Sequence, residues 1–136
     1  MLGDVGQLPL PLGGRVVRHG EVADPWPFLC GADVVVAAAG DATIADVAAA
    51  RAPLVAVPQP RPYAEQTAHV AILADQGLCV AAEPWPDRRG WRTLLDRAGA
   101  LGGAGWAQQA DGLGAHRAAA FLQELAADRQ GVPAGV

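Results

Sequence analysis

Residues 32–58 decide the fold of this chain, and they read ADVVVAAAGDATIADVAAARAPLVAVP. A continuous apolar run at 34–36 follows an aspartate, which is typical of a strand buried on both faces of a parallel sheet. A turn of small residues comes next, then a helix over 43–50 and a second apolar strand at 54–57, which Pro58 ends. This order of strand, helix and strand predicts a parallel crossover unit.

The alternation of strands and helices extends in both directions from this stretch. Short apolar or β-branched runs predict four strands, at 15–18, 33–37, 54–57 and 78–81. Helices are predicted over 43–50, over 64–76, after the capping residue Asp87, and over 115–129. A glycine-rich stretch at 99–105 is predicted to be a loop. We therefore expect an α/β fold, with a Rossmann-like parallel sheet of about four strands and helices on both faces.

The length of 136 residues fits one domain. Glycine and proline interrupt any period in residues 1–14, so an irregular N-terminus is expected there. The domain itself is predicted over 15–130, and a flexible tail over 131–136.

Composition argues against several classes of protein. The net charge of −4 and the pI of about 5.2 do not suit a nucleic-acid binder, which usually presents a basic surface. No apolar run approaches the ~18 residues that a membrane-spanning helix needs. The first residues also lack the basic start and long apolar stretch of a signal peptide, so a cytoplasmic protein is expected.

The histidines and cysteines give no indication of a metal or cofactor site. His19, His69 and His116 are scattered, and none has metal-ligand spacing with a second ligand. Cys30 and Cys79 lie far apart, and each is expected to be a buried free thiol. The sequence contains no Asp-x-Asp pair, which is the simplest sign of a metal-bound diphosphate. We predict no metal and no cofactor.

The turn after the 34–36 strand is the first candidate binding site, because ligands of open α/β sheets bind at the carboxyl ends of strands. Gly40 removes a Cβ, which lets a ligand approach the backbone closely. The helix that follows offers free N–H groups and the positive end of its dipole, and Thr43 adds a hydroxyl. Asp46 lies three residues later on the same helix face and is suited to two vicinal hydroxyls, such as those of a ribose.

The loop after Val57 is the second candidate site. It leads to Glu65 and Gln66 in the first turn of the next helix, where a carboxylate and an amide suit the hydroxyls of a sugar. A purely structural interpretation stays open for both sites. Asp41 then serves as an N-cap, Asp46 complements the helix dipole, and the second site is an ordinary polar first turn.

Several of these features occur together in one order: ADVVV at 32–36, the small turn at Gly40, Thr43 and Asp46, AAA at 48–50, Pro53, the strand to Pro58, and Glu65-Gln66. In this order and spacing, residues 15–83 resemble the donor domain of GT-B glycosyltransferases. The pattern is most similar to the MurG-like group, glycosyltransferase family 28. The fold implied by this resemblance is part of a GT-B donor domain.

The resemblance implies a set of residues that bind a UDP-sugar: Val22, Gly40, Asp41, Ala42, Thr43, Asp46, Glu65 and Gln66. In the family pattern, the backbone of Val22, at the end of the first strand, would meet the uracil edge. The turn from Gly40 to Thr43 would hold the diphosphate.

The other implied contacts are to the sugars. Asp46 would bind the ribose hydroxyls, where the family usually has glutamate, and Glu65 with Gln66 would hold the donor sugar. No catalytic residue is implied in this chain, because the family's base normally lies in the acceptor domain. Metal is not generally needed in the donor site of this fold.

Four departures from the family pattern bear on function. Asp46 is one methylene shorter than the usual glutamate, so its reach is less. Asp41 puts a negative charge beside the implied diphosphate, which should weaken binding. Arg51 replaces a glycine that is usual at the end of that helix. The opening strand, its glycine-rich loop and the N-terminal acceptor domain are missing from the chain.

We therefore expect the UDP-sugar-binding part of a hexosyltransferase, inactive as an isolated chain. The alternative is a degenerate, non-catalytic GT-B-like module with a structural or interaction role. The expected partners are a nucleotide-sugar and a missing acceptor domain or partner chain. Without its neighbouring strands, the 34–36 strand would expose an apolar edge. The 15–18 strand, a second copy of the chain or the missing part of the enzyme would cover that edge, and of these we expect a homodimer.

Overall fold

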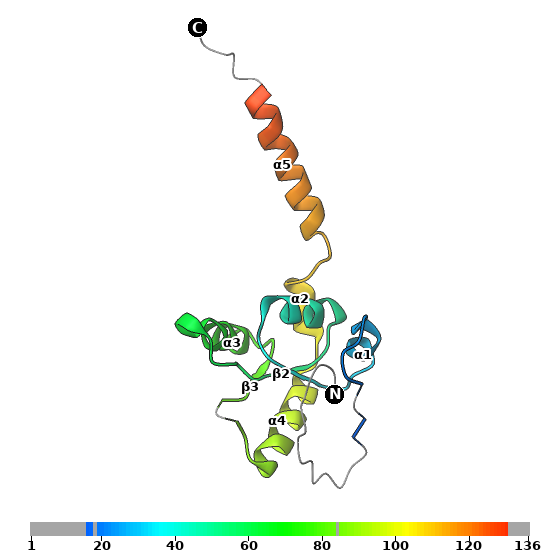
Figure 1. The fold of residues 1–136 in the computed structure, drawn as a ribbon, viewed down its shortest axis with the longest axis vertical. Helices are drawn as coiled ribbons and strands as arrows, with labels where there is room; N and C mark the ends of the chain where they lie inside the picture. Colours follow the sequence, from blue (N-terminus) through cyan, green and yellow to red (C-terminus); the bar gives the residue numbers. More distant parts are fainter. Residues whose placement is uncertain (1–15, 18, 84, 131–136) are drawn as a thin grey trace.

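A computed structural model describes residues 16–17, 19–83 and 85–130 of the chain (Figure 1). The predicted irregular N-terminus at 1–14 and the predicted tail at 131–136 lie outside the described residues. The elements, in chain order, are α1 (Trp26–Cys30), β1 (Val35–Ala37), α2 (Asp41–Ala50), β2 (Leu54–Ala56), the 3-10 helix η1 (Pro62–Ala64), α3 (Glu65–Asp75), β3 (Val80–Ala81), α4 (Arg88–Leu101), the 3-10 helix η2 (Ala104–Gln108) and α5 (Gly114–Gln130).

The three strands of the described sheet are parallel and lie in the order β1-β2-β3. Val36 of β1 pairs with Val55 of β2, which in turn pairs with Val80 of β3. All three residues of β2 are buried, as the apolar run at 54–57 predicts for a central strand. The predicted α/β class and parallel sheet are confirmed.

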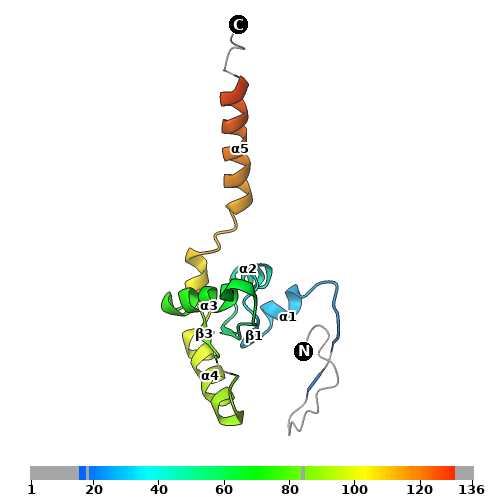
Figure 2. The same ribbon diagram turned by 60° about the vertical axis from the view of Figure 1, so that its left-hand side comes forward.

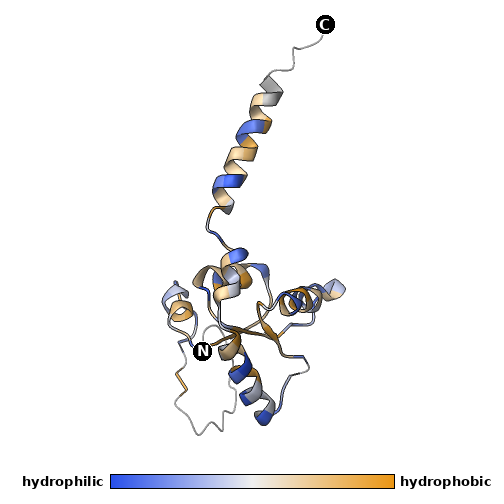
Figure 3. Ribbon diagram, turned by 180° about the vertical axis from the view of Figure 1, so that it is seen from behind, coloured by the Kyte–Doolittle hydropathy of each residue, from blue (hydrophilic) through white to orange (hydrophobic). Residues whose placement is uncertain are grey.

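Helices cover both faces of this sheet (Figures 1 and 2). On one face, α2 and α3 pack over Leu54 and Ala56, and Trp106 of η2 completes this part of the core. On the other face, α4 packs over Val55 and Val80 through residues such as Ala98. Figure 3 shows the strands as hydrophobic and the half of α4 that lies farther from the strands as largely hydrophilic.

Two sequence predictions about the elements are wrong. The described part of the expected strand at 15–18, Val16 and Val17, is exposed and has no strand conformation, so the described residues form three strands and not four. The predicted loop at 99–105 contains the last turn of α4 and the start of η2. Burial of Ala98 against the sheet holds that turn in place, and α4 ends where Gly102 takes a φ of 69°.

A tight contact joins η2 to the turn between α2 and β2. Arg51 ends α2 in the left-handed conformation, with a φ of 52°. Gly103 lies so close that a Cβ there would overlap the carbonyl oxygen of Arg51. Trp106 is buried beside this contact, and its Nε1 donates to the carbonyl oxygen of Ala52 at 3.1 Å. Side-chain burial and backbone proximity together fix where α2 ends and β2 begins.

The expectation that both thiols are buried holds for Cys79 and is wrong for Cys30. Cys30 is exposed, because it ends the five-residue helix α1, which has no buried residue. Cys79 lies in the core, and burial raises its pKa to about 11.

The last helix, α5, projects away from the rest of the described chain (Figures 1 and 2). Asp111 organises its start, accepting hydrogen bonds from the Leu113 backbone at 2.9 Å and from Arg117 at 2.6 Å. These contacts hold the pKa of the Asp111 carboxyl below its usual value, with the Arg117 bond as the main cause. Among the described residues, no helix has both the length and the apolar character that crossing a membrane requires.

Candidate functional site

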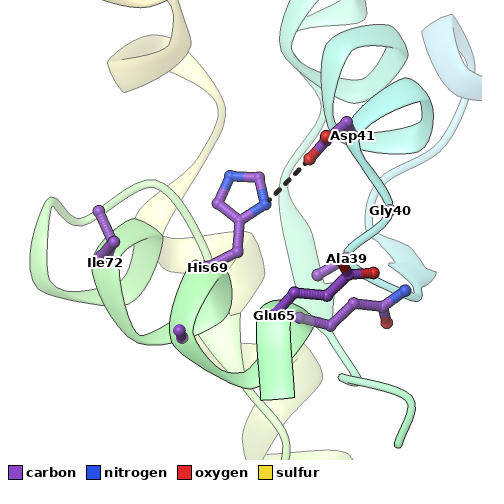
Figure 4. A pocket seen from close by; sticks show the side chains of 8 residues that line it. Ala39, Gly40, Asp41, Glu65, His69 and Ile72 are labelled. Atoms are coloured by element: carbon purple, nitrogen blue, oxygen red, sulfur yellow. Dashed lines mark ion pairs between the residues drawn. The ribbon is translucent and has the colours of Figure 1, made fainter. Parts of the chain in front are cut away.

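A pocket of about 400 Å³ opens at the carboxyl end of β1, between the first turns of α2 and α3 (Figure 4). Its lining residues come from the turn after β1 and from one side of α3: Ala39, Gly40, Asp41, Glu65, Gln66, Ala68, His69 and Ile72. The pocket exists because parallel strands bring the loops that follow them to one edge of the sheet.

The N-terminus of α2 borders this pocket without a side-chain cap. Gly40 is the N-cap residue, and Asp41 is the first residue of the helix. The first backbone bond of α2 runs from the Ile44 N–H to the Gly40 carbonyl at 3.0 Å, so the N–H groups of the preceding turn have no acceptor within the helix. Such N–H groups and the helix dipole favour an anion at this point.

Gln66 is a buried polar side chain that turns a donor toward the same point. Its side chain is only 6% exposed, and its Oε1 accepts a hydrogen bond from the Gln59 backbone at 2.9 Å. That bond orients the amide, because a backbone N–H requires the oxygen. The Nε2 group lies 4.0 Å from the Cβ position of Gly40 and donates to no described residue. It is a free donor in the wall of the pocket.

The start of α3 supplies the rest of the polar lining. Glu65 is its first residue and is exposed at the pocket. The residues before it, Tyr63 and Ala64, have φ values of 62° and 52°, in the left-handed region that non-glycine residues rarely adopt. This conformation turns the chain from β2 into α3 and sets the first turn of α3 beside that of α2.

A carboxylate and an imidazole face each other across the pocket. The Nδ1 atom of His69 lies 3.5 Å from the Oδ1 atom of Asp41 (Figure 4). The two residues come from different helices, α3 and α2. An ion pair of this kind requires a protonated imidazole.

Residues 28–83 match the family model of the glycosyltransferase family 28 C-terminal domain. The match covers fewer than half of the 136 residues, and it supports a C-terminal domain of the glycosyltransferase family 28 type in this part of the chain. The comparisons with curated proteins and with solved structures gave no match. The segment runs from α1 to the end of β3 and contains every residue that lines the pocket, so the resemblance seen in the sequence is confirmed.

The structure brings together half of the binding residues that the sequence predicts. Gly40, Asp41, Glu65 and Gln66 line one pocket. The remaining four predicted residues do not line it: Val22, Ala42, Thr43 and Asp46. Their predicted contacts with the nucleotide stay predictions.

The structure changes the interpretation of three predicted residues. Gly40, not Asp41, is the N-cap of α2, so the alternative that Asp41 caps the helix is wrong. Val22 precedes α1 in irregular backbone, whereas the prediction placed it at the end of a strand. Asp46 is exposed in the second turn of α2.

Gly40 does not occupy a sterically tight place in the protein itself. Its φ of −73° and ψ of 143° suit any residue, and a Cβ would meet nothing nearer than Gln66 Nε2 at 4.0 Å. The small size of residue 40 is therefore of use to a ligand and not to the fold.

The sequence predictions did not include His69 and Ile72, which also line the pocket. Both follow Glu65 at helical spacing, four and seven residues later, which places them on one side of α3. That spacing could have identified them once the side of α3 that faces the pocket was known.

Proposed function

We propose that this family 28 domain binds a UDP-sugar in the pocket between α2 and α3, as the donor-binding part of a glycosyltransferase. The observation that carries the proposal is the uncapped N-terminus of α2 beside the free Nε2 donor of Gln66. One anionic group placed there gains hydrogen bonds from backbone and side chain together.

The pocket suggests where each part of the donor lies. The diphosphate is assigned to the turn from Gly40 to Thr43, at the N-terminus of α2. The hexose is assigned to the wall formed by Glu65 and Gln66, since a carboxylate and an amide are suited to sugar hydroxyls. The nucleoside then extends out of the pocket toward Asp46, where ribose hydroxyls would bind.

The proposed reaction transfers a hexosyl group from the UDP-sugar to an acceptor held by a separate domain or chain. We assign no catalytic residue to the described part of this chain. The role of its residues is to bind and orient the donor, and no metal or cofactor enters the proposal. The cytoplasmic location and the homodimer stay predictions from the sequence.

Calorimetric titration of the full chain with UDP-glucose and ADP-glucose tests the proposed ligand. We expect weak binding of UDP-glucose, with a dissociation constant in the high micromolar range or above, because Asp41 repels the diphosphate. Binding of ADP-glucose should be weaker still. Absence of UDP-glucose binding at millimolar concentration, or equal binding of the two ligands, would contradict the proposal.

One observation favours the alternative of a non-catalytic module. The Asp41 carboxylate is 99% exposed and lies at the helix end proposed for the diphosphate. If Asp41 marks a site that has lost its ligand, the Asp41→Asn variant should bind UDP-glucose no better than the unaltered chain. If the site is functional and only weakened by this charge, the variant should bind several-fold more tightly.

A further inference from the structure

His69 is a pocket residue without a role in the assignment above. Its side chain is 32% exposed, and it lines both the pocket and a neighbouring depression of about 320 Å³ between α2, α3 and η2. Asp41 is shared by the same two hollows. The pair of His69 and Asp41 therefore lies on the border between them.

The contact between these two side chains is easily exchanged. The Asp41 carboxylate is almost fully exposed and makes no hydrogen bond with the described residues apart from its approach to His69. Ion pairs between exposed groups contribute little to stability, because water solvates both partners well. Asp41 can rotate into solvent at small cost and leave the imidazole free for another anion.

The position of the Asp41–His69 pair indicates which anion would replace Asp41 beside the imidazole. Asp41 is the first residue of α2, so its carboxylate sits at the helix end that attracts negative charge. The buried Gln66 side chain directs its free Nε2 donor toward Gly40, at the same helix end. A diphosphate bound to these donors would approach His69 from the place where the Asp41 carboxylate now lies.

Resting on the function proposed above, we propose that His69 is a contact residue for the diphosphate of the donor and that Asp41 is the internal anion it releases. Asp41 thus competes with the ligand for the imidazole. A protonated His69 adds a positive charge to a pocket whose other ionisable lining residues, Asp41 and Glu65, carry negative charge.

The charge of His69 makes donor binding depend on pH. Histidine is the side chain that ordinarily changes its charge between about pH 5 and about pH 8. The charged groups that face His69 are Asp41 from α2 and Glu65 from its own helix. The η2 region packs Trp106, Gln109 and Ala110 against the same depression and brings no charge.

Calorimetry with UDP-glucose at about pH 6 and about pH 8 tests this role in the full chain. The diphosphate of UDP-glucose is a diester and keeps its charge over this range, so a change in affinity reports on the protein. We expect His69→Gln to weaken binding about fivefold at the lower pH, which is the effect of about 1 kcal/mol for one charge pair near 4 Å in water. At the higher pH the two proteins should bind nearly alike. The matched control is His116→Gln on the exposed helix α5, which should leave both affinities unchanged.

The Asp41→Asn variant, with and without His69→Gln, distinguishes two roles for His69. The imidazole either contacts the ligand directly or only neutralises the charge of Asp41. If His69 contacts the ligand, His69→Gln should weaken binding at least as much in the Asp41→Asn background as in the unaltered chain. If His69 acts only by neutralising Asp41, its effect should vanish in that background, which would overturn the proposal. Binding by the unaltered chain with no effect of His69→Gln at the lower pH would also overturn it and leave the proposed function intact. Absence of any UDP-glucose binding would overturn both.

Discussion

Replacing Gly40 with alanine should weaken ligand binding while leaving the stability of the fold nearly unchanged. The backbone of Gly40 is in an extended conformation, with a φ of −73°, that alanine adopts without strain. The nearest heavy atom to the new methyl group is Gln66 Nε2, at 4.0 Å, which is an ordinary van der Waals contact. The folded protein therefore has room for the added carbon.

Two small and opposite effects then act on the free energy of unfolding. Alanine is a poorer N-cap residue than glycine, which costs about 0.5 kcal/mol. Alanine also restricts the unfolded chain, which stabilises the fold by about 0.4–1 kcal/mol. The net change expected from Gly40→Ala is within about 0.5 kcal/mol.

The effect on a ligand should be much larger. The 4.0 Å between the added methyl carbon and Gln66 Nε2 is one contact distance, so no ligand oxygen fits between them. A diphosphate would lose at least one hydrogen bond to a charged oxygen, worth about 1.5 kcal/mol, and bind roughly tenfold more weakly.

Urea denaturation and calorimetric titration with UDP-glucose measure the two effects on the same sample. Gly99→Ala is the matched control, because its Cβ meets Val34 Cγ2 at an ordinary 3.9 Å and α4 lies on the other face of the sheet. It should leave binding unchanged. Unaltered affinity in Gly40→Ala would refute the placement of the diphosphate. A loss of stability well above 1 kcal/mol would refute the claim that the fold has room at residue 40.

Four further predictions concern separate parts of the chain. Asp46→Ala should weaken the binding of UDP roughly tenfold and the binding of 2′,3′-dideoxy-UDP much less. If calorimetry shows the same loss of affinity for both ligands, Asp46 acts through the helix and not through the ribose. Arg51→Gly should raise the free energy of unfolding by about 0.5–1 kcal/mol, because Arg51 holds a φ of 52°; a lower urea midpoint would contradict this. Cys79 keeps its proton to about pH 11 when folded and loses it near 9.0 when unfolded. Stability should therefore fall between these values as pH rises, by up to about 1.4 kcal/mol per unit, with a shallower slope in Cys79→Ala. The strand β1 forms one edge of the described sheet, and its residue Val36 is 45% exposed. We therefore expect the chain to form a dimer at micromolar concentration. A monomer in light scattering would contradict this prediction.

The central part of the fold could be predicted because its signals are local. The apolar run at 54–57 and the end of the helix predicted over 64–76 need no knowledge of the rest of the chain. Gly77 follows that helix and has a φ of 67°, which glycine adopts readily. The strand expected at 15–18 rested on a weaker signal. Only Val16 and Val17 of that run are β-branched, and two such residues do not specify a strand, because strand propensity depends strongly on context. The final turn of α4 was missed because burial of Ala98 outweighs the glycines around it.

The site was predictable to the extent that it depends on sheet topology. The loops after β1 and β2 were expected at one edge of a parallel sheet, and Gly40 and Gln66 do meet there. The rotation of α3 about its axis depends on how its buried residues pack, and the sequence does not reveal it in advance. His69 therefore escaped notice, although it lies one helical turn after Glu65.

The geometry of the pocket depends on a contact well outside it. The direction of α2 determines where its free N–H groups point, and the end of α2 is held by the close approach of Gly103 to Arg51. The buried Trp106 side chain adds a hydrogen bond to Ala52 at 3.1 Å and packs in the same core as α2 and α3. Because η2 thus anchors one end of α2 and the sheet anchors the other, the N-terminus of α2 is held in place before any ligand arrives. Preorganised donors of this kind lower the entropic cost of binding, which compensates in part for the repulsion from Asp41.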